Sequence, residues 1–185
     1  MKVQTINVFF AMLTVIADLA VVSFIAVALM ARDGGSAGEL RDRLWDRVGQ
    51  IALPLAALVG LTAMLGSLYY SEVAHYLPCR LCWYQRIAMY PMPLLLGIAA
   101  FRRDHDIRRY VIPMALVGAA ISIYHYQLEW FPSQSSPACT LDAPCTVRWV
   151  FELGFISMPY MALSGFALIA WLAWIAGQRP ATRPA

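Results

Sequence analysis

Five long apolar stretches limit what this chain can fold into more than any other feature of its sequence. A helix needs about 20 mostly apolar residues to cross the hydrocarbon core of a bilayer. The stretches lie near residues 7–31, 51–71, 80–101, 110–128 and 158–176. The first is longer than the core of a signal peptide and is followed by no clear A-x-A cleavage site, so it is interpreted as a retained helix. The sequence therefore predicts an all-α integral membrane protein with five spanning helices.

The composition supports this class and argues against others. Hydrophobic residues make up 61% of the 185-residue chain and charged residues 14%, whereas a soluble domain is about a quarter charged. The net charge of +3 is small and dispersed, which argues against binding to nucleic acid. The sequence contains neither a nucleotide-binding glycine loop nor an internal repeat.

The basic residues divide unequally between the two sides of the membrane. Segments 32–50, 102–109 and 177–185 fall on one side and contain ten arginines, whereas the opposite side carries four basic residues. Cytoplasmic loops carry the excess of positive charge, so we expect the first set in the cytoplasm. All four cysteines and the N-terminus then lie on the other side, which in bacteria is oxidising and allows disulfides to persist.

Two features of the first 50 residues have competing interpretations. Segment 32–50 is polar with a stripe of Leu, Trp and Val. It is expected to form either a short amphipathic helix on the inner membrane surface or a solvated linker. Asp18 lies inside the first span, a position where ionisable residues often have a function. A protonated or backbone-paired aspartate, or a shifted register of the span, is the favoured interpretation.

A pair of cysteines, Cys79 and Cys82, lies at the outer start of the third span in the stretch LPCRLCWYQR. The 15 residues 87–101 would form a helix of only about 22 Å, which is too short to cross the membrane. We therefore expect the helix to begin near Arg80, and Pro78 suits such a start. Both thiols then lie in or beside the first turn.

The start of a helix favours thiol chemistry. Free N–H groups and the helix dipole stabilise negative charge there, which favours the reactive thiolate. Arg86 lies four residues after Cys82 and shares its face. It can pair with a thiolate or with a reduced, anionic cofactor, and an arginine near the membrane interior is costly without such a partner.

Metal binding and static disulfides are the alternatives for these cysteines. Zinc ribbons usually repeat the tight C-x-x-C spacing, whereas the second pair, Cys139 and Cys145, has the spacing C-x5-C. Two structural disulfides are the other alternative, since extracellular loops often carry them. A bridge between residues three apart restrains the unfolded chain little, so a redox role explains Cys79 and Cys82 better.

The second pair lies in the stretch CTLDAPC, within a segment rich in proline, serine and alanine that has no helical pattern. Such loops are mobile and often carry function. A loop disulfide can be presented to a partner protein and can carry electrons back to a fixed site. Exchange of this kind requires access for a mixed disulfide.

These residues resemble a known family. The stretches SLYYSEVAHYLPCRLCWYQRIAMYPMPLLLGIAAFRRD, ISIYHYQ, CTLDAPC and GFISMPYMALSGFALI are similar to the bacterial disulfide-bond formation protein B family (DsbB), especially its short BdbC-like branch. The resemblance implies a four-helix bundle in the bacterial inner membrane with both cysteine pairs on the periplasmic side. It also implies reoxidation of a thioredoxin-like (DsbA-type) carrier and transfer of the electrons to ubiquinone or menaquinone.

The resemblance also implies roles for individual residues. Cys79 and Cys82 match the quinone-coupled pair, with Cys82 in contact with the quinone and Arg86 beside it. Cys139 and Cys145 match the shuttle pair, in which Cys139 would form the mixed disulfide with the carrier.

One weaker match concerns His125. It falls near a histidine that some family members hold close to the quinone, and a packing histidine is an equally good interpretation.

The chain departs from the family in its N-terminal part, because the family usually has four spans. Residues 1–50 would add an N-terminal transmembrane helix and a cytoplasmic segment to the bundle of residues 51–176, which a tail of residues 177–185 follows. A reductase of the vitamin K epoxide type uses similar parts, but there the C-x-x-C follows the loop pair. A metal-binding membrane protein and a structural bundle with static disulfides are the alternatives from other classes.

Overall fold

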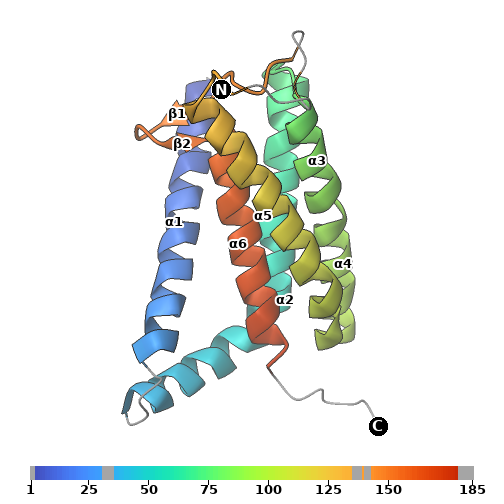
Figure 1. The fold of residues 1–185 in the computed structure, drawn as a ribbon. Helices are drawn as coiled ribbons and strands as arrows, with labels where there is room; N and C mark the ends of the chain where they lie inside the picture. The colour runs from blue at the N-terminus through green and yellow to red at the C-terminus, as the bar shows by residue number, and fades with distance from the viewer. Residues whose placement is uncertain (1–2, 31–35, 135–138, 140–142, 179–185) are drawn as a thin grey trace.

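The computed structural model describes residues 3–30, 36–134, 139 and 143–178, and in this part the protein is an all-α bundle (Figure 1). Its six α-helices are α1 (Val3–Met30), α2 (Ser36–Leu68), α3 (Arg80–Met89), α4 (Pro91–Arg102), α5 (Arg108–Trp130) and α6 (Met158–Ala176). A π-helical turn, Tyr69–Val73, extends α2, and a 3-10 turn, His105–Ile107, precedes α5. A two-stranded antiparallel hairpin, β1 (Phe151–Glu152) and β2 (Ile156–Ser157), lies before α6.

The helices account for the five predicted spans. Four helical segments are long and apolar enough to cross a membrane: Val3–Met30, Arg41–Val73, His105–Trp130 and Met158–Ala176. The remaining predicted span consists of α3 and α4, which follow each other along one side of the bundle (Figure 1). The helix is interrupted at Tyr90 and Pro91 because proline has no N–H to continue the hydrogen-bond ladder. The fold is thus a four-helix membrane bundle with an added N-terminal helix.

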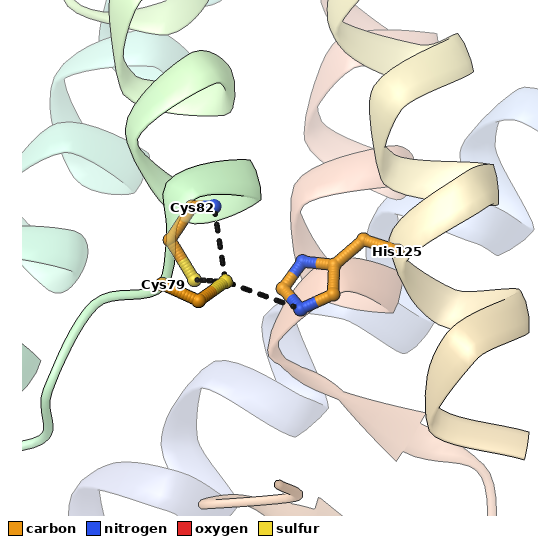
Figure 2. Close-up of side chains that lie close together, drawn as sticks. All are labelled: Cys79, Cys82 and His125. Carbon is orange, nitrogen blue, oxygen red and sulfur yellow. Dashed lines mark hydrogen bonds between the residues drawn. The ribbon is translucent and has the colours of Figure 1, made fainter. Parts of the chain in front are cut away.

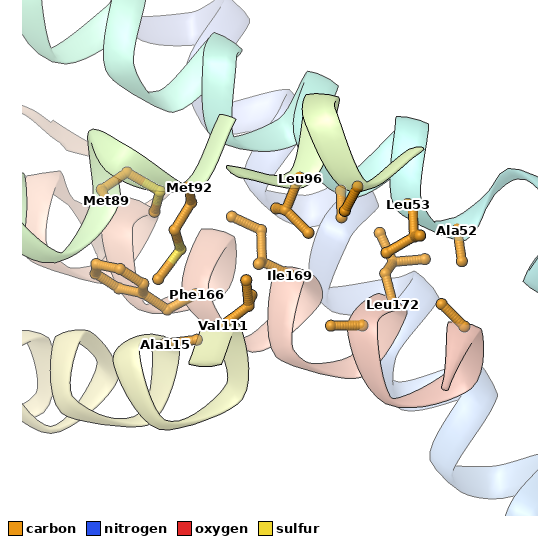
Figure 3. Packing of buried hydrophobic residues seen from close by; sticks show 14 of the residues in the cluster. Ala52, Leu53, Met89, Met92, Leu96, Val111, Ala115, Phe166, Ile169 and Leu172 are labelled. Atoms are coloured by element: carbon orange, nitrogen blue, oxygen red, sulfur yellow. The ribbon is translucent and has the colours of Figure 1, made fainter. Parts of the chain in front are cut away.

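The main core is formed where α6 packs against α2, α4 and α5. Phe166, Ile169 and Leu172 of α6 are almost completely buried there, and Met92 and Leu96 of α4 contribute to the same cluster (Figure 3). Outward-facing positions of the spans are occupied by exposed large apolar side chains, as expected where lipid covers the surface. Packing inside the bundle therefore depends on close fit between helices.

The segment 36–50 forms the first part of α2 and does not behave as an unstructured linker. Figure 1 shows it running across the lower end of the bundle before the chain turns along the bundle axis. Pro54 lies inside the helix just after this turn, and a proline bends a helix at the preceding turn. Trp45 is buried and its ring contacts Phe24 and Trp171 at centroid distances of 5.7 and 6.3 Å. The helical alternative is therefore confirmed for the described part of this segment.

The added helix α1 packs directly on the bundle, mainly against α6. The hydroxyl of Tyr160 donates a hydrogen bond of 3.0 Å to Asp18 Oδ2, so the aspartate in the first span has a side-chain partner from α6, where the sequence suggested a backbone partner. Gln4 donates to Glu152 of the hairpin at 2.9 Å. Both contacts join α1 to the part of the chain that contains β1, β2 and α6.

The cysteine pairs lie at the end of the bundle where α1 begins and α5 ends (Figure 1). The turn between α4 and α5 and the end of α6 lie at the opposite end. This arrangement agrees with the predicted alternation of the connecting segments, since every cysteine is at one end and the basic turn at residues 102–109 is at the other.

We expect a methyl group at Gly118 to destabilise the bundle. A Cβ atom there would overlap with the ring of Phe166, a side chain that is completely buried and has no space to move. Gly118→Ala should lower the free energy of unfolding by about 1–3 kcal/mol, the usual cost of overpacking, as measured by thermal unfolding in detergent. The matched control is Gly97→Ala, because among the described residues a Cβ there would meet nothing within 4 Å apart from its chain neighbours and the backbone of its own helix. Equal stability of the two variants would contradict the prediction.

Candidate functional site

Cys79 and Cys82 lie at the start of α3, as the helix-length argument predicts. Cys79 is the N-cap residue, with extended backbone angles, and its sulfur accepts a hydrogen bond from the N–H of Cys82 at 3.4 Å. This contact satisfies one of the N–H groups that a helix leaves free in its first turn. The helix start thus directs a positive backbone dipole at the sulfur of Cys79.

The two sulfurs and one imidazole form a compact buried group (Figure 2). Cys79 Sγ lies 3.1 Å from Cys82 Sγ and 3.6 Å from Nε2 of His125, which α5 supplies. Cys79 and His125 are each 3% exposed, whereas Cys82 is only partly buried. The structure therefore brings His125 beside the C-x-x-C pair, in contact with Cys79.

The surroundings of Cys79 favour its thiolate. The hydrogen bond from the thiol of Cys82 lowers the pKa of the Cys79 thiol most, and His125 and the Cys82 N–H lower it further, although burial acts in the opposite direction. A thiolate is the nucleophile in disulfide exchange. In the dithiol form, these contacts thus favour the thiolate on Cys79, although the spacing in the sequence places Arg86 on the face of Cys82.

Arg86 is held at the α2–α3 contact. Its Nε and Nη2 atoms donate to Oγ and the carbonyl of Ser67 at 2.9 and 3.0 Å, and its guanidinium lies 5.2 Å from the ring centroid of Trp83. The charge is close enough to Cys82 to interact with it electrostatically. Arg86 keeps N–H groups beyond these two bonds, because a guanidinium has five donors.

The loop cysteines join the same cluster. Cys139 and Cys145 form a disulfide with their Cα atoms 5.6 Å apart. Cys145 is 1% exposed and packs with Cys79, Leu81 and Leu128. The segment that carries the second pair is thus anchored at Cys145 next to the other pair, while residues 135–138 and 140–142 lie outside the described residues.

Sequence reasoning missed one buried ionisable residue of this site. Glu129 of α5 is 3% exposed and interacts electrostatically with His125, Arg148 and Cys79. The stretch YHYQLEW contains a signal for it, because His125 and Glu129 are four residues apart and share a helix face. A carboxyl close to the end of an apolar span is a second signal.

The three side chains Cys79, Cys82 and His125 also have the composition of a metal site, since their ligand atoms all lie within 4.8 Å of one another. The geometry fits zinc poorly. Two sulfurs about 2.3 Å from a tetrahedral zinc ion are about 3.8 Å apart, whereas these sulfurs are 3.1 Å apart, a hydrogen-bonding distance. Cys139 and Cys145 are joined to each other, so in this structure their sulfurs are not thiolates that could complete a metal site.

Comparison with known proteins gives a consistent result. The family model described as disulfide bond formation protein DsbB matches residues 49–179. A protein of Bacillus subtilis named disulfide bond formation protein C is 50% identical over 113 residues, which cover 60% of this chain and 82% of that protein.

Two further relatives have similar names. A probable disulfide formation protein of Deinococcus radiodurans is 46% identical over 132 residues, covering 66% of this chain and 86% of its own length. Probable disulfide formation protein C 1 of Bacillus cereus is 45% identical over 131 residues, covering 70% of this chain and 94% of its own. No solved structure matches.

The contact between His125 and Cys79 should be visible in thiol reactivity. In a Cys139→Ser/Cys145→Ser background, we expect His125→Ala to raise the pKa of the Cys79 thiol and so to slow its alkylation by iodoacetamide in mildly acidic buffer. A rise of about one unit in the pKa of the thiol lowers the alkylation rate about tenfold at a pH where the thiolate is the minor form. Alkylation is followed by mass spectrometry of the Cys79 peptide.

The control for this prediction is His105→Ala, at the opposite end of the bundle beside α5. It should leave the alkylation profile unchanged. An identical profile in His125→Ala would show that the imidazole does not stabilise the Cys79 thiolate.

Proposed function

Because this chain belongs to the disulfide bond formation protein DsbB family, we propose that it takes electrons from a thioredoxin-like (DsbA-type) dithiol carrier and passes them to a membrane quinone. Membership of the family and the names of its relatives support the general activity, which is disulfide formation by a membrane oxidoreductase. The observation that carries the specific proposal is the shared cluster. Cys79 and the loop disulfide residue Cys145 are both buried in one group of side chains at one end of the bundle.

The proposed electron path has two exchange steps. A carrier thiolate attacks the disulfide of Cys139 and Cys145, with Cys139 forming the mixed disulfide, and the second carrier thiol then releases the carrier as a disulfide. One freed loop thiolate attacks a disulfide between Cys79 and Cys82. The loop disulfide re-forms and the inner pair becomes a dithiol. Each exchange moves two electrons and needs the sulfurs to approach in line, which the common cluster favours.

The chain's own residues suit an electron acceptor beside Cys82. The side chain of Cys82 is only partly buried, and the neighbouring Trp83 and Ile87 are 52% and 67% exposed on the apolar surface of α3. Arg86, with N–H donors beyond those used by Ser67, would bind a carbonyl oxygen of the quinone. We also assign His125 to the proposed quinone site. When bound, a quinone accepts two electrons and two protons.

We further propose that the protein lies in the bacterial inner membrane with both cysteine pairs on the periplasmic side. The excess of arginine at the opposite end supports this orientation. In this reading residues 1–50 are an addition to the bundle of residues 51–176, and the tail 177–185 is cytoplasmic. Static disulfides would not require an imidazole against one sulfur of a dithiol, so the contact of His125 with Cys79 favours the redox function.

Quinone reduction by the purified protein in detergent tests the proposed function. With a reduced thioredoxin-like donor, wild-type protein should consume quinone, whereas Cys82→Ser should not, because the inner disulfide cannot form. A Cys139→Ser/Cys145→Ser variant should fail with the protein donor but keep turnover with a small dithiol that reaches the inner pair directly. Absence of turnover in wild type, with four cysteines that stay oxidised beside the donor, would refute the proposal.

A second test addresses Arg86. Replacement by methionine removes charge-assisted hydrogen bonds worth about 1.5–3 kcal/mol each, so we expect the KM for quinone to rise by about 10–100-fold while exchange with the carrier is unaffected. The matched control is Arg80→Met, since Arg80 is exposed at the start of the same helix. Equal KM values for the two variants would exclude Arg86 from the acceptor site.

A further inference from the structure

The redox cluster borders a buried carboxyl group that the proposed electron path does not use. Glu129 is 3% exposed, and its Oε2 atom has no hydrogen-bond partner among the described residues. It lies one helical turn after His125, on the same face of α5. A buried carboxylate with an unpaired oxygen is costly, so the charge on Glu129 must depend on the charges around it.

Four side chains from α5 and the segments around it interact with this carboxyl electrostatically or by hydrogen bonding. They are His125 of α5, Cys79 before α3, Arg148 of the loop before β1, and Ser157 at the end of β2. Arg148 is fixed in place, because its Nη2 donates to the carbonyl of Glu129 at 2.6 Å and its guanidinium lies 4.5 and 4.8 Å from two aromatic ring centroids. Arginine stays protonated in proteins, so Arg148 supplies a permanent positive charge.

Two acidic groups, Cys79 and Glu129, therefore share one permanent positive charge in a buried place. Like charges that are close together in such surroundings disfavour each other, and one of the two groups keeps its proton. When Cys79 joins Cys82 in a disulfide, its negative charge is removed. The positive charge of Arg148 is then available to stabilise a carboxylate.

We propose that Glu129 is a redox-linked proton site, whose carboxyl is protonated while Cys79 is a thiolate and ionised once Cys79 and Cys82 have formed a disulfide. The inference rests on the proposed function, because it requires this pair to alternate between dithiol and disulfide. The observation that carries it is one buried carboxyl that interacts electrostatically with both Cys79 and Arg148, whose guanidinium is held by the backbone carbonyl of Glu129.

The electrons and protons of this step balance. Among Cys79, Cys82 and Glu129, the reduced form holds two protons, one on the thiol of Cys82 and one on Glu129, and the oxidised form holds neither. Oxidation forms the S–S bond and releases two electrons with both protons. A quinone takes up the same numbers of electrons and protons when it becomes a quinol. Without the carboxyl of Glu129, the same oxidation releases only one proton from these groups.

Equilibrium with dithiothreitol near neutral pH tests this count. Dithiothreitol also exchanges two protons with two electrons, so the ratio of oxidised to reduced Cys79–Cys82 in wild type should not depend on pH. In Glu129→Gln, oxidation releases one proton fewer, and the ratio should fall about tenfold for each unit rise in pH, equivalent to about 30 mV. The ratio is measured by alkylating the free thiols and determining the masses of the peptides by mass spectrometry.

Two variants serve as controls. Glu152→Gln makes the same change in the neighbouring hairpin, where the side chain accepts a hydrogen bond from Gln4, and it should behave as wild type. Glu129→Asp retains a carboxyl and should also give a ratio independent of pH. If Glu129→Gln does not fold, infrared difference spectra of wild type give the answer, because oxidation should remove the C=O stretch of one protonated carboxyl, and Glu129→Asp should shift this band.

The outcomes separate this inference from the proposed function. A wild-type pair that equilibrates with dithiothreitol while Glu129→Gln shows no pH dependence would overturn the role of Glu129 and leave the electron path intact. A wild-type pair that never exchanges with dithiothreitol would overturn the electron path, and the role of Glu129 with it.

Discussion

The burial of the Cys79 sulfur at the start of α3 is the constraint on which the rest of the candidate site depends. An anionic sulfur loses water when it is buried and needs other groups to stabilise it. The fold supplies these groups from three directions, through the first turn of α3, the thiol of Cys82 and the imidazole of His125. The helices are arranged so that α5 passes the start of α3 with His125 facing it (Figure 2).

The spans and the start of α3 were predictable from the sequence because they follow from short-range rules. Apolar length fixes the crossing helices, and the shortage of apolar residues after Ile87 requires a helix that begins near Arg80, as it does. The interruption at Pro91 and the hairpin before α6 were not predicted. The interruption gives no signal because the apolar pattern of the span continues through it. The hairpin gives none because two-residue strands are too short to produce an alternating pattern.

The site was predictable in its cysteines and less so in its contacts. Spacing identifies Cys79 and Cys82 as a pair, but it does not show which sulfur accepts a hydrogen bond from a free N–H group of the first turn. That depends on the cap geometry, which selects Cys79. Glu129 needed tertiary information, because its importance comes from Arg148 and Cys79, which are distant in sequence and meet it only after α3, α5 and the loop have packed.

The number of membrane crossings decides on which side of the membrane each end of the chain lies. With five crossings the parity is odd, so α1 begins at the end of the bundle that holds the cysteines, and α6 finishes at the other (Figure 1). A four-crossing chain would have both ends in one compartment. A soluble domain fused ahead of α1 would therefore share its compartment with the disulfide chemistry, whereas one fused after α6 would be separated from it by the bilayer.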